Sequence, residues 1–280
     1  MGFADINGIK ICYEIHGDGY PVILVHGFGS KKETWIAQIP PLSAHFKVIA
    51  FDNRGAGKSD RPEEPFTMEM FTRDIRGLMD FLKIEKAHII GWSLGGMIVQ
   101  EFVLKYPERV NKVVLINTAY KVVGSGSDTK AKDMYINMRL EDLKLLQRDP
   151  KESFWKSARV SYYHKFRKQM MANTKKKFYG LWSVEEIIKD RAIDPPTPRD
   201  IENQAHALNN FNTFERLKEI KNKTLLLTAS HDRILPKTVM IDMHERIPTS
   251  TLKIIDKAGH SSPRSKAPEL NQTIIDFLKD

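Results

Sequence analysis

Short apolar runs separated by longer segments constrain this fold more than any other feature of the sequence. The runs are Val22–Val25, Val48–Phe51, Ala87–Ile90, Val113–Ile116, Thr224–Thr228 and Thr251–Ile255. Continuous apolar runs of this length are typical of strands that are buried on both faces of a parallel sheet. Helical periodicity lies between them, for example over Met68–Leu82, and the helix expected over Pro268–Leu278 closes the chain. The alternation predicts an α/β fold with a mostly parallel central sheet flanked by helices.

Two segments depart from this alternation. Near the start, apolar Ile9, Ile11 and Tyr13 alternate with polar residues after Asn7-Gly8, which predicts antiparallel strands joined by a hairpin. After Thr118 the strand rhythm stops, and the following residues have a helical pattern. We therefore expect a core made of residues 1–119 and 212–280, interrupted by a helical cap insertion over 120–211 (hereafter the cap).

The composition is that of a globular protein, with 41% apolar and 28% charged residues among 280. Apolar stretches fall short of the roughly 18 residues of a membrane span. Asp5, Lys10 and Glu14 interrupt the segment where a signal peptide would have its apolar core. A single cysteine, Cys12, forms no internal disulfide, so we expect a cytoplasmic protein.

The formal net charge of +9 is concentrated in one part of the chain. Residues 151–180 contain nine Lys or Arg and one acid, Glu152, so the remaining sequence is close to neutral. A solvated face is the ordinary interpretation of such a segment, and an acidic substrate or anionic partner is the alternative. Because no nucleic-acid-binding motif accompanies the charge, we expect no nucleic-acid partner.

Gly91-Trp92-Ser93-Leu94-Gly95 follows one predicted strand and opens a predicted helix. A serine in such a sharp strand-to-helix turn projects its hydroxyl outward, and the flanking glycines relieve crowding. The positive end of the helix then lies near a developing oxyanion. The motif predicts Ser93 as a nucleophile and the Leu94 N–H as an oxyanion donor.

A serine nucleophile needs a base, and His260 follows the last predicted strand. Loops at the carboxyl ends of parallel strands converge on one edge of the sheet, which is where Ser93 also emerges. The alternative for His260 is an ordinary surface-loop histidine.

The histidine needs an anionic partner, and Asp232 follows the strand Thr224–Thr228. Asn117 and Thr118 stand at the rival position after the preceding strand but carry no charge. Asp256 is a second rival, and Asp232 has Arg233 beside it as an alternative ion-pair partner. We predict the order Ser93, Asp232, His260, which is that of a strand-elbow hydrolase.

The second oxyanion donor should come from the loop His26-Gly27-Phe28-Gly29, where the Phe28 N–H is our candidate. We expect His26 to be a neutral, buried histidine that hydrogen-bonds the nearby backbone rather than the catalytic base.

These motifs together resemble the α/β-hydrolase superfamily, in its serine-nucleophile, esterase-like branch with a helical cap. The resemblance covers residues 3–119 and 212–280 and rests on His26–Gly29, Asp52–Ser59, Gly91–Gly96, Asp232 and Gly259-His260. It implies that Asp52–Ser59, which lacks P-loop spacing, is a structural turn beside the site.

A serine at the elbow argues against the dehalogenase and epoxide hydrolase branches, which carry aspartate there. We predict a serine hydrolase that cleaves carboxylic esters of small to medium acyl substrates through an acyl-enzyme. A lactonase, a C–C bond hydrolase of the meta-cleavage product type, and a non-turnover ligand receptor remain alternatives. No cofactor is expected, and the scattered histidines predict no metal site. The oligomeric state is not indicated.

Aromatic and Met residues crowd the cap and either line a pocket over Ser93 or form the core of the cap itself. They are Phe154, Trp155, Tyr162, Tyr163, Met170, Met171, Phe178, Tyr179 and Trp182. Core packing is the commoner fate of such residues.

Overall fold

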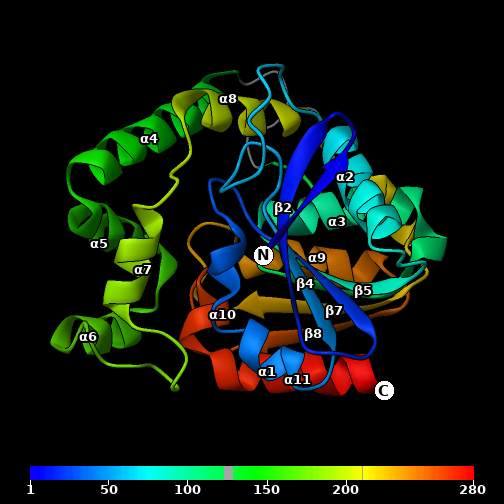
Figure 1. Ribbon diagram of the computed structural model, residues 1–280. Coiled ribbons are helices and arrows are strands. Elements are labelled where there is room, and N and C mark those ends of the chain that lie inside the picture. Colours follow the sequence, from blue (N-terminus) through cyan, green and yellow to red (C-terminus); the bar gives the residue numbers. More distant parts are fainter. Residues whose placement is uncertain (123–128, 210) are drawn as a thin grey trace.

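A computed structural model describes residues 1–122, 129–209 and 211–280. Within these ranges the strands form one eight-stranded sheet in the order β1-β2-β4-β3-β5-β6-β7-β8 (Figure 1). The strands are β1 (Gly2–Ile6), β2 (Ile9–His16), β3 (Pro21–Val25), β4 (Lys47–Phe51), β5 (Ala87–Trp92), β6 (Val110–Ile116), β7 (Lys223–Ala229) and β8 (Ser250–Ile255). Each apolar run singled out above lies in one of them, so the predicted α/β sheet is confirmed.

The sheet is parallel from β4 to β8, and its other edge is antiparallel. Strands β1 and β2 form the expected hairpin, in which Ile6 pairs with Ile9. Asn7 and Gly8 have φ of 51° and 78°, and two consecutive positive φ values are what a type I′ turn requires. Asn-Gly is the dipeptide that adopts them most readily.

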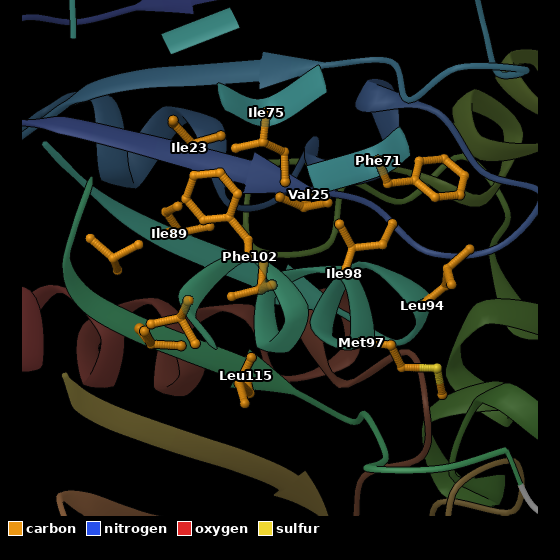
Figure 2. Close-up of a cluster of buried hydrophobic side chains, with 14 of the residues drawn as sticks. Ile23, Val25, Phe71, Ile75, Ile89, Leu94, Met97, Ile98, Phe102 and Leu115 are labelled. Carbon is orange, nitrogen blue, oxygen red and sulfur yellow. The ribbon is translucent and has the colours of Figure 1, made fainter. Parts of the chain in front are cut away.

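Helices cover both faces of the sheet, because successive residues of each buried strand point in opposite directions. Ile23 and Val25 of β3 pack with α2 (Met68–Phe81), α3 (Leu94–Lys105) and α9 (Lys237–Arg246), whereas Val22 and Leu24 pack with α1 (Ile39–Ser43) and α11 (Ala267–Lys279). Figure 2 shows the first of these cores, where side chains of α2 and α3 meet those of β3, β5 and β6. The helices and 3-10 turns of this core are η1 (Lys32–Trp35), α1 (Ile39–Ser43), α2 (Met68–Phe81), α3 (Leu94–Lys105), η2 (Pro107–Arg109), η3 (Phe214–Glu219), α9 (Lys237–Arg246), α10 (Ser262–Ser265) and α11 (Ala267–Lys279).

Helices occupy the described part of the connection between β6 and β7, and they lie to one side of the sheet (Figure 1). They are α4 (Thr129–Arg148), α5 (Pro150–Ser161), α6 (His164–Ala172), α7 (Val184–Arg191) and α8 (Pro198–Ala207). A hydrophobic cluster joins α5, α6 and α7, and its members include Phe154, Tyr162, Met170, Phe178 and Trp182. Most of the cap aromatic residues named in the sequence analysis therefore pack against one another.

The surface of these helices and of the loop between α6 and α7 carries the basic charge. Lys156, Arg159, Lys165 and Lys168 are exposed, as are Lys175–Lys177. This distribution fits a solvated face. Among the described residues, no helix is long and apolar enough to cross a lipid bilayer.

Candidate active site

Ser93 stands in a strained turn between β5 and α3, with φ of 58° and ψ of −122°. Gly91 and Gly95 make this turn sterically feasible. A Cβ atom on Gly91 would lie 2.5 Å from the Gly95 carbonyl oxygen, and one on Gly95 would lie 2.0 Å from the Val25 carbonyl oxygen. Both distances are far inside van der Waals contact, so the two glycines of the motif are required by close backbone packing.

The backbone on both sides of Ser93 is fixed by hydrogen bonds. The Ser93 N–H donates to the Ile116 carbonyl at 3.0 Å, and the Thr118 hydroxyl donates to the Ser93 carbonyl at 2.7 Å. Ser93 itself is half-buried. A positive φ in a serine held this firmly is backbone strain of the kind that is found at functional sites.

His260 and Asp232 form a buried pair at the same edge of the sheet. The His260 Nδ1–Asp232 Oδ2 distance is 2.7 Å, and the Asp232 carboxylate is fully buried. The second oxygen, Oδ1, accepts hydrogen bonds from the N–H groups of Ile234 at 2.8 Å and Leu235 at 2.9 Å. Because the carboxylate only accepts, it assigns the proton to Nδ1 of His260 and leaves Nε2 as the basic atom.

The acidic rival of Asp232 and its alternative ion-pair partner both lie on the surface. Asp256 is on the surface, 3.5 Å from Lys257 Nζ, with a side chain that is 70% exposed. Arg233 is also exposed, and no ion pair joins it to Asp232 in the described part of the chain. The structure therefore places Asp232, of these acids, beside His260.

Asn117 links the end of β7 to the segment that carries His260. The sequence did not predict this role, because the position was considered only as a place for the acidic partner of His260. It is fully buried just after β6. Its Nδ2 donates to the His260 carbonyl and to Ser262 Oγ, both at 2.8 Å, and its Oδ1 accepts from the Ala229 N–H at 2.9 Å. Its φ of 43° suits asparagine better than most residues. An Asn directly after a buried strand was the only available signal.

No hydrogen bond joins Ser93 Oγ to His260 Nε2 among the described residues. Such contacts are often long in ligand-free hydrolases and shorten when substrate binds. The Trp92 ring packs against the His260 ring at 5.9 Å, and its Nε1 donates to the His260 carbonyl at 3.2 Å. The residue before Ser93 thus contacts the histidine directly.

His26 is buried and neutral, as expected. Its Nδ1 lies 2.9 Å from the Gly27 carbonyl, to which it donates, and its Nε2 accepts from the Asn53 N–H at 3.0 Å. Burial lowers the pKa of His26, and the nearby Asp52 carboxylate opposes that shift without overcoming it. Asn53 belongs to the segment Asp52–Ser59, which is a buried turn: Asp52 accepts from the Lys32 N–H at 2.7 Å.

The backbone N–H groups of Leu94 and Phe28 were predicted as oxyanion donors, and the structure shows the segments that carry them. Leu94 is the first residue of α3, so its N–H has no acceptor within the helix. In the loop after β3, the Gly29 N–H is occupied, because it donates to Gln204 Oε1 of α8 at 2.9 Å. Gly27 lies against Ser93, since a Cβ on it would be 3.2 Å from the Ser93 Cβ. The loop that carries Phe28 therefore lies against the turn of Ser93, and the Phe28 N–H stays a prediction as the second donor.

Helices α4, α5 and α8 contact these loops. The Ser261 N–H, next to His260, donates to the Ser161 carbonyl at the end of α5 at 2.9 Å. A Cβ on Gly259 would lie 2.6 Å from the same carbonyl oxygen. Phe28 packs with Leu143 of α4 and Ile201 of α8.

Within the described chain, no group of three or more His, Cys, Asp or Glu side chains has the arrangement of a metal site. The chemistry available at this edge is that of a strained serine, a histidine with a basic Nε2, a buried carboxylate and helix N–H groups. Those are the parts needed for attack on an acyl carbon.

Comparison with known proteins gives consistent matches. Residues 20–264 match the family model for the alpha/beta hydrolase fold. The 2-hydroxy-6-oxo-6-phenylhexa-2,4-dienoate hydrolase of Comamonas testosteroni is 30% identical, over 98% of this chain and 93% of the relative. The enol-lactonase of Burkholderia xenovorans LB400 has a TM-score of 0.82 at 23% identity, covering 100% of both chains. A thermophilic esterase of Thermogutta terrifontis, solved with malate bound, has a TM-score of 0.81 at 25% identity, covering 99% of this chain and 97% of the other. This chain therefore belongs to the alpha/beta hydrolase family.

Proposed function

We propose that this protein is a serine hydrolase that cleaves carboxylic esters of small to medium substrates through an acyl-enzyme. The observation that carries the proposal is the buried Asp232–His260 pair at the sheet edge where the strained Ser93 emerges. In this proposal Ser93 is the nucleophile, His260 is the base and Asp232 orients it.

The proposed reaction uses each part in turn. His260 Nε2 takes the Ser93 proton as Oγ attacks the acyl carbon, and the Phe28 and Leu94 N–H groups receive the oxyanion. His260 then returns the proton to the leaving alcohol. Water repeats the sequence on the acyl-enzyme, which releases the acid and restores Ser93.

We further propose that residues 120–211 act as a cap over this site. Lys121 and Asn212 form an isolated antiparallel bridge, so the chain leaves and re-enters the core at adjacent points. The contacts of Ser161 with the His260 loop and of Gln204 with Gly29 support a covering role.

A second candidate is hydrolysis of a C–C bond or a lactone on the same residues. The observation that favours it is the near full-length similarity to a 2-hydroxy-6-oxo-6-phenylhexa-2,4-dienoate hydrolase. A serine and histidine of this geometry serve either bond, because both reactions need an acyl carbon that is attacked and an oxyanion that is stabilised.

The test is a substrate panel of aliphatic p-nitrophenyl esters of several lengths, lactones and vinylogous diketones. We expect multiple turnovers with the esters and their loss in Ser93→Ala. Acylation that stops after a single turnover would contradict the proposed enzymatic activity and indicate a ligand receptor. Preferred cleavage of vinylogous diketones would replace the ester assignment with the second candidate.

A further inference from the structure

The loop after β3, residues 26–32 (hereafter the β3 loop), is anchored to the core at both ends. At its start, His26 Nε2 accepts a hydrogen bond from the Asn53 N–H at 3.0 Å. At its end, the Lys32 N–H donates to Asp52 Oδ1 at 2.7 Å. Because both partners are buried, the two ends of the loop have fixed positions.

The middle of the β3 loop is held by a side chain of α8. Gly29 follows Phe28 and has φ of 59°, and its N–H donates to Gln204 Oε1 at 2.9 Å. Gln204 is 2% exposed, and its Nε2 donates to the Gly55 carbonyl at 3.4 Å. The Gly29 N–H belongs to the peptide plane that directly follows Phe28, so the amide of Gln204 restrains the backbone of the predicted oxyanion donor.

Neighbouring side chains fix α8 to the core, so Gln204 reaches the β3 loop from a fixed position. Asn203 Nδ2 donates to the Pro62 carbonyl at 3.2 Å, and its side chain is buried. His206 Nδ1 donates to the Phe66 carbonyl at 3.0 Å. The acceptors of these two bonds lie in a different core segment from the β3 loop. Of these three side chains, Gln204 is therefore the one that binds the β3 loop.

The Phe28 side chain is held by the same helix. Its ring packs with Leu143 of α4 and Ile201 of α8. Ile201 precedes Gln204 by three positions, so the two side chains lie on one face of α8. The face that packs against the Phe28 ring thus also binds the N–H of the next residue, and a movement of α8 would displace both.

We propose that Gln204 is a positioning residue for the reaction at Ser93. By accepting the hydrogen bond of the Gly29 N–H, it holds the β3 loop in the conformation that directs the Phe28 N–H toward the oxyanion. Gln204 acts through the loop rather than on the substrate. The inference rests on the proposed function, because an oxyanion forms only if Ser93 attacks an acyl carbon.

The first experiment removes the acceptor without emptying the site. Gln204→Met keeps an unbranched side chain of similar size, and its kcat for p-nitrophenyl butyrate should fall about 10- to 100-fold. KM should change little, because the ester binds before the oxyanion forms. Gln204→Glu keeps an oxygen that accepts the Gly29 N–H, so its kcat should lie closer to that of the wild type than to that of Gln204→Met.

Asn203→Leu is the matched control, because Asn203 lies beside Gln204 on α8, is similarly buried and also binds a core carbonyl. Its melting temperature should fall, as in Gln204→Met, but its kcat should equal that of the wild type. A purely structural role for Gln204 predicts instead that the two variants lose stability and activity together.

Inhibition by trifluoromethyl hexyl ketone reports on the oxyanion directly. Ser93 Oγ bonds to the ketone carbon, the carbonyl electron pair moves to the oxygen, and the serine proton passes to His260 Nε2. The inhibition constant should rise in Gln204→Met by a factor similar to the fall in kcat. Trifluoromethyl hexyl carbinol, the corresponding alcohol, forms no oxyanion, and its inhibition constant should stay unchanged.

Hydrogen exchange tests the restraint without turnover. Amide exchange in the peptide that spans the β3 loop should be faster in Gln204→Met than in the wild type, and Asn203→Leu should match the wild type. If the wild type hydrolyses no ester, or if hydrolysis survives in Ser93→Ala, the proposed function is refuted. Faster exchange in Gln204→Met with unchanged kcat would refute the inference and leave the proposed function standing.

Other results would also overturn the inference. One is a loss of kcat in Asn203→Leu as large as that in Gln204→Met, and another is a Gln204→Glu variant as slow as Gln204→Met. Equal exchange rates in the wild type and Gln204→Met would show that the β3 loop does not depend on this side chain. An equal rise in the inhibition constants of the ketone and the carbinol would indicate a general loss of binding instead.

Discussion

Replacing Asn117 by alanine separates the scaffold of the site from its chemistry. Within the described residues Asn117 makes no hydrogen bond to Ser93 Oγ or to the His260 ring, but it bonds the His260 carbonyl, Ser262 Oγ and the Ala229 N–H. We expect Asn117→Ala to destabilise the fold and to reduce activity in the fraction that remains folded.

The magnitude follows from the three hydrogen bonds. The His260 carbonyl keeps a second donor, Trp92 Nε1, whereas the buried Ala229 N–H loses the acceptor that Asn117 provides. An unsatisfied buried N–H costs about 1–3 kcal/mol, and each further lost bond costs about 1 kcal/mol. Alanine at a positive φ adds about 1 kcal/mol. The free energy of unfolding should therefore fall by about 4–6 kcal/mol, a large share of a typical stability of about 5–15 kcal/mol.

Asn7→Ala is the matched control, because Asn7 has a similar φ of 51° but lies exposed in the hairpin turn. Asn7→Ala also places alanine at a positive φ, but it loses a single side-chain hydrogen bond, to Asp74. Urea unfolding of both variants and kcat/KM on a p-nitrophenyl ester form the assay. We expect kcat/KM to fall about 10- to 100-fold in Asn117→Ala, because His260 is displaced. Equal stabilities for the two variants, with kcat/KM within about twofold of wild type, would refute the reasoning.

Three further predictions concern separate features. Asp232→Asn should reduce kcat about 10⁴-fold by reversing the favoured tautomer of His260, and a loss below about tenfold would contradict its proposed role. Gly95→Ala should lower the free energy of unfolding by more than about 3 kcal/mol, because its Cβ would lie 2.0 Å from the Val25 carbonyl oxygen, whereas Gly180→Ala has open space and should cost about 1 kcal/mol. Burial lowers the pKa of His88 to about 4, so the folded state resists its protonation and stability is lost as the pH falls from about 6.5 to 4. His88→Phe should remove up to about 3 kcal/mol of that loss. The measurement is the free energy of unfolding of both proteins at each pH, and the same dependence on pH in both would contradict the prediction.

The sheet could be predicted from sequence because burial on both faces leaves a signal within single segments. Val22–Val25 needs no information from elsewhere in the chain to be interpreted as a buried strand. The Ser93 motif is likewise local, since Gly91 and Gly95 are required by the turn that they flank.

The supporting groups could not be predicted, because their roles depend on contacts between distant residues. Asn117 acts on loops that begin more than a hundred positions later, and nothing in its neighbours indicates a triple hydrogen bond. Arg139 likewise has no distinguishing sequence neighbours, and its contact with the Phe28 ring depends on how α4 packs against the core. The interpretation that the cap aromatic residues pack among themselves is confirmed for Tyr162, but nothing in the sequence indicates that its hydroxyl is buried without a partner in the described part of the chain.

The pairing of β6 with β7 has a consequence for how the chain assembles. Lys112 pairs with Lys223 and Ile116 with Leu227, so adjacent central strands are separated by the whole helical insertion. Closing so long a loop costs only about 0.6 kcal/mol more for each doubling of its length, but it slows the formation of the pair. We expect the N-terminal strands β1–β6 to associate early, and the β7–β8 half, which carries Asp232 and His260, to dock last. The nucleophile and its base would then meet only when the sheet is complete.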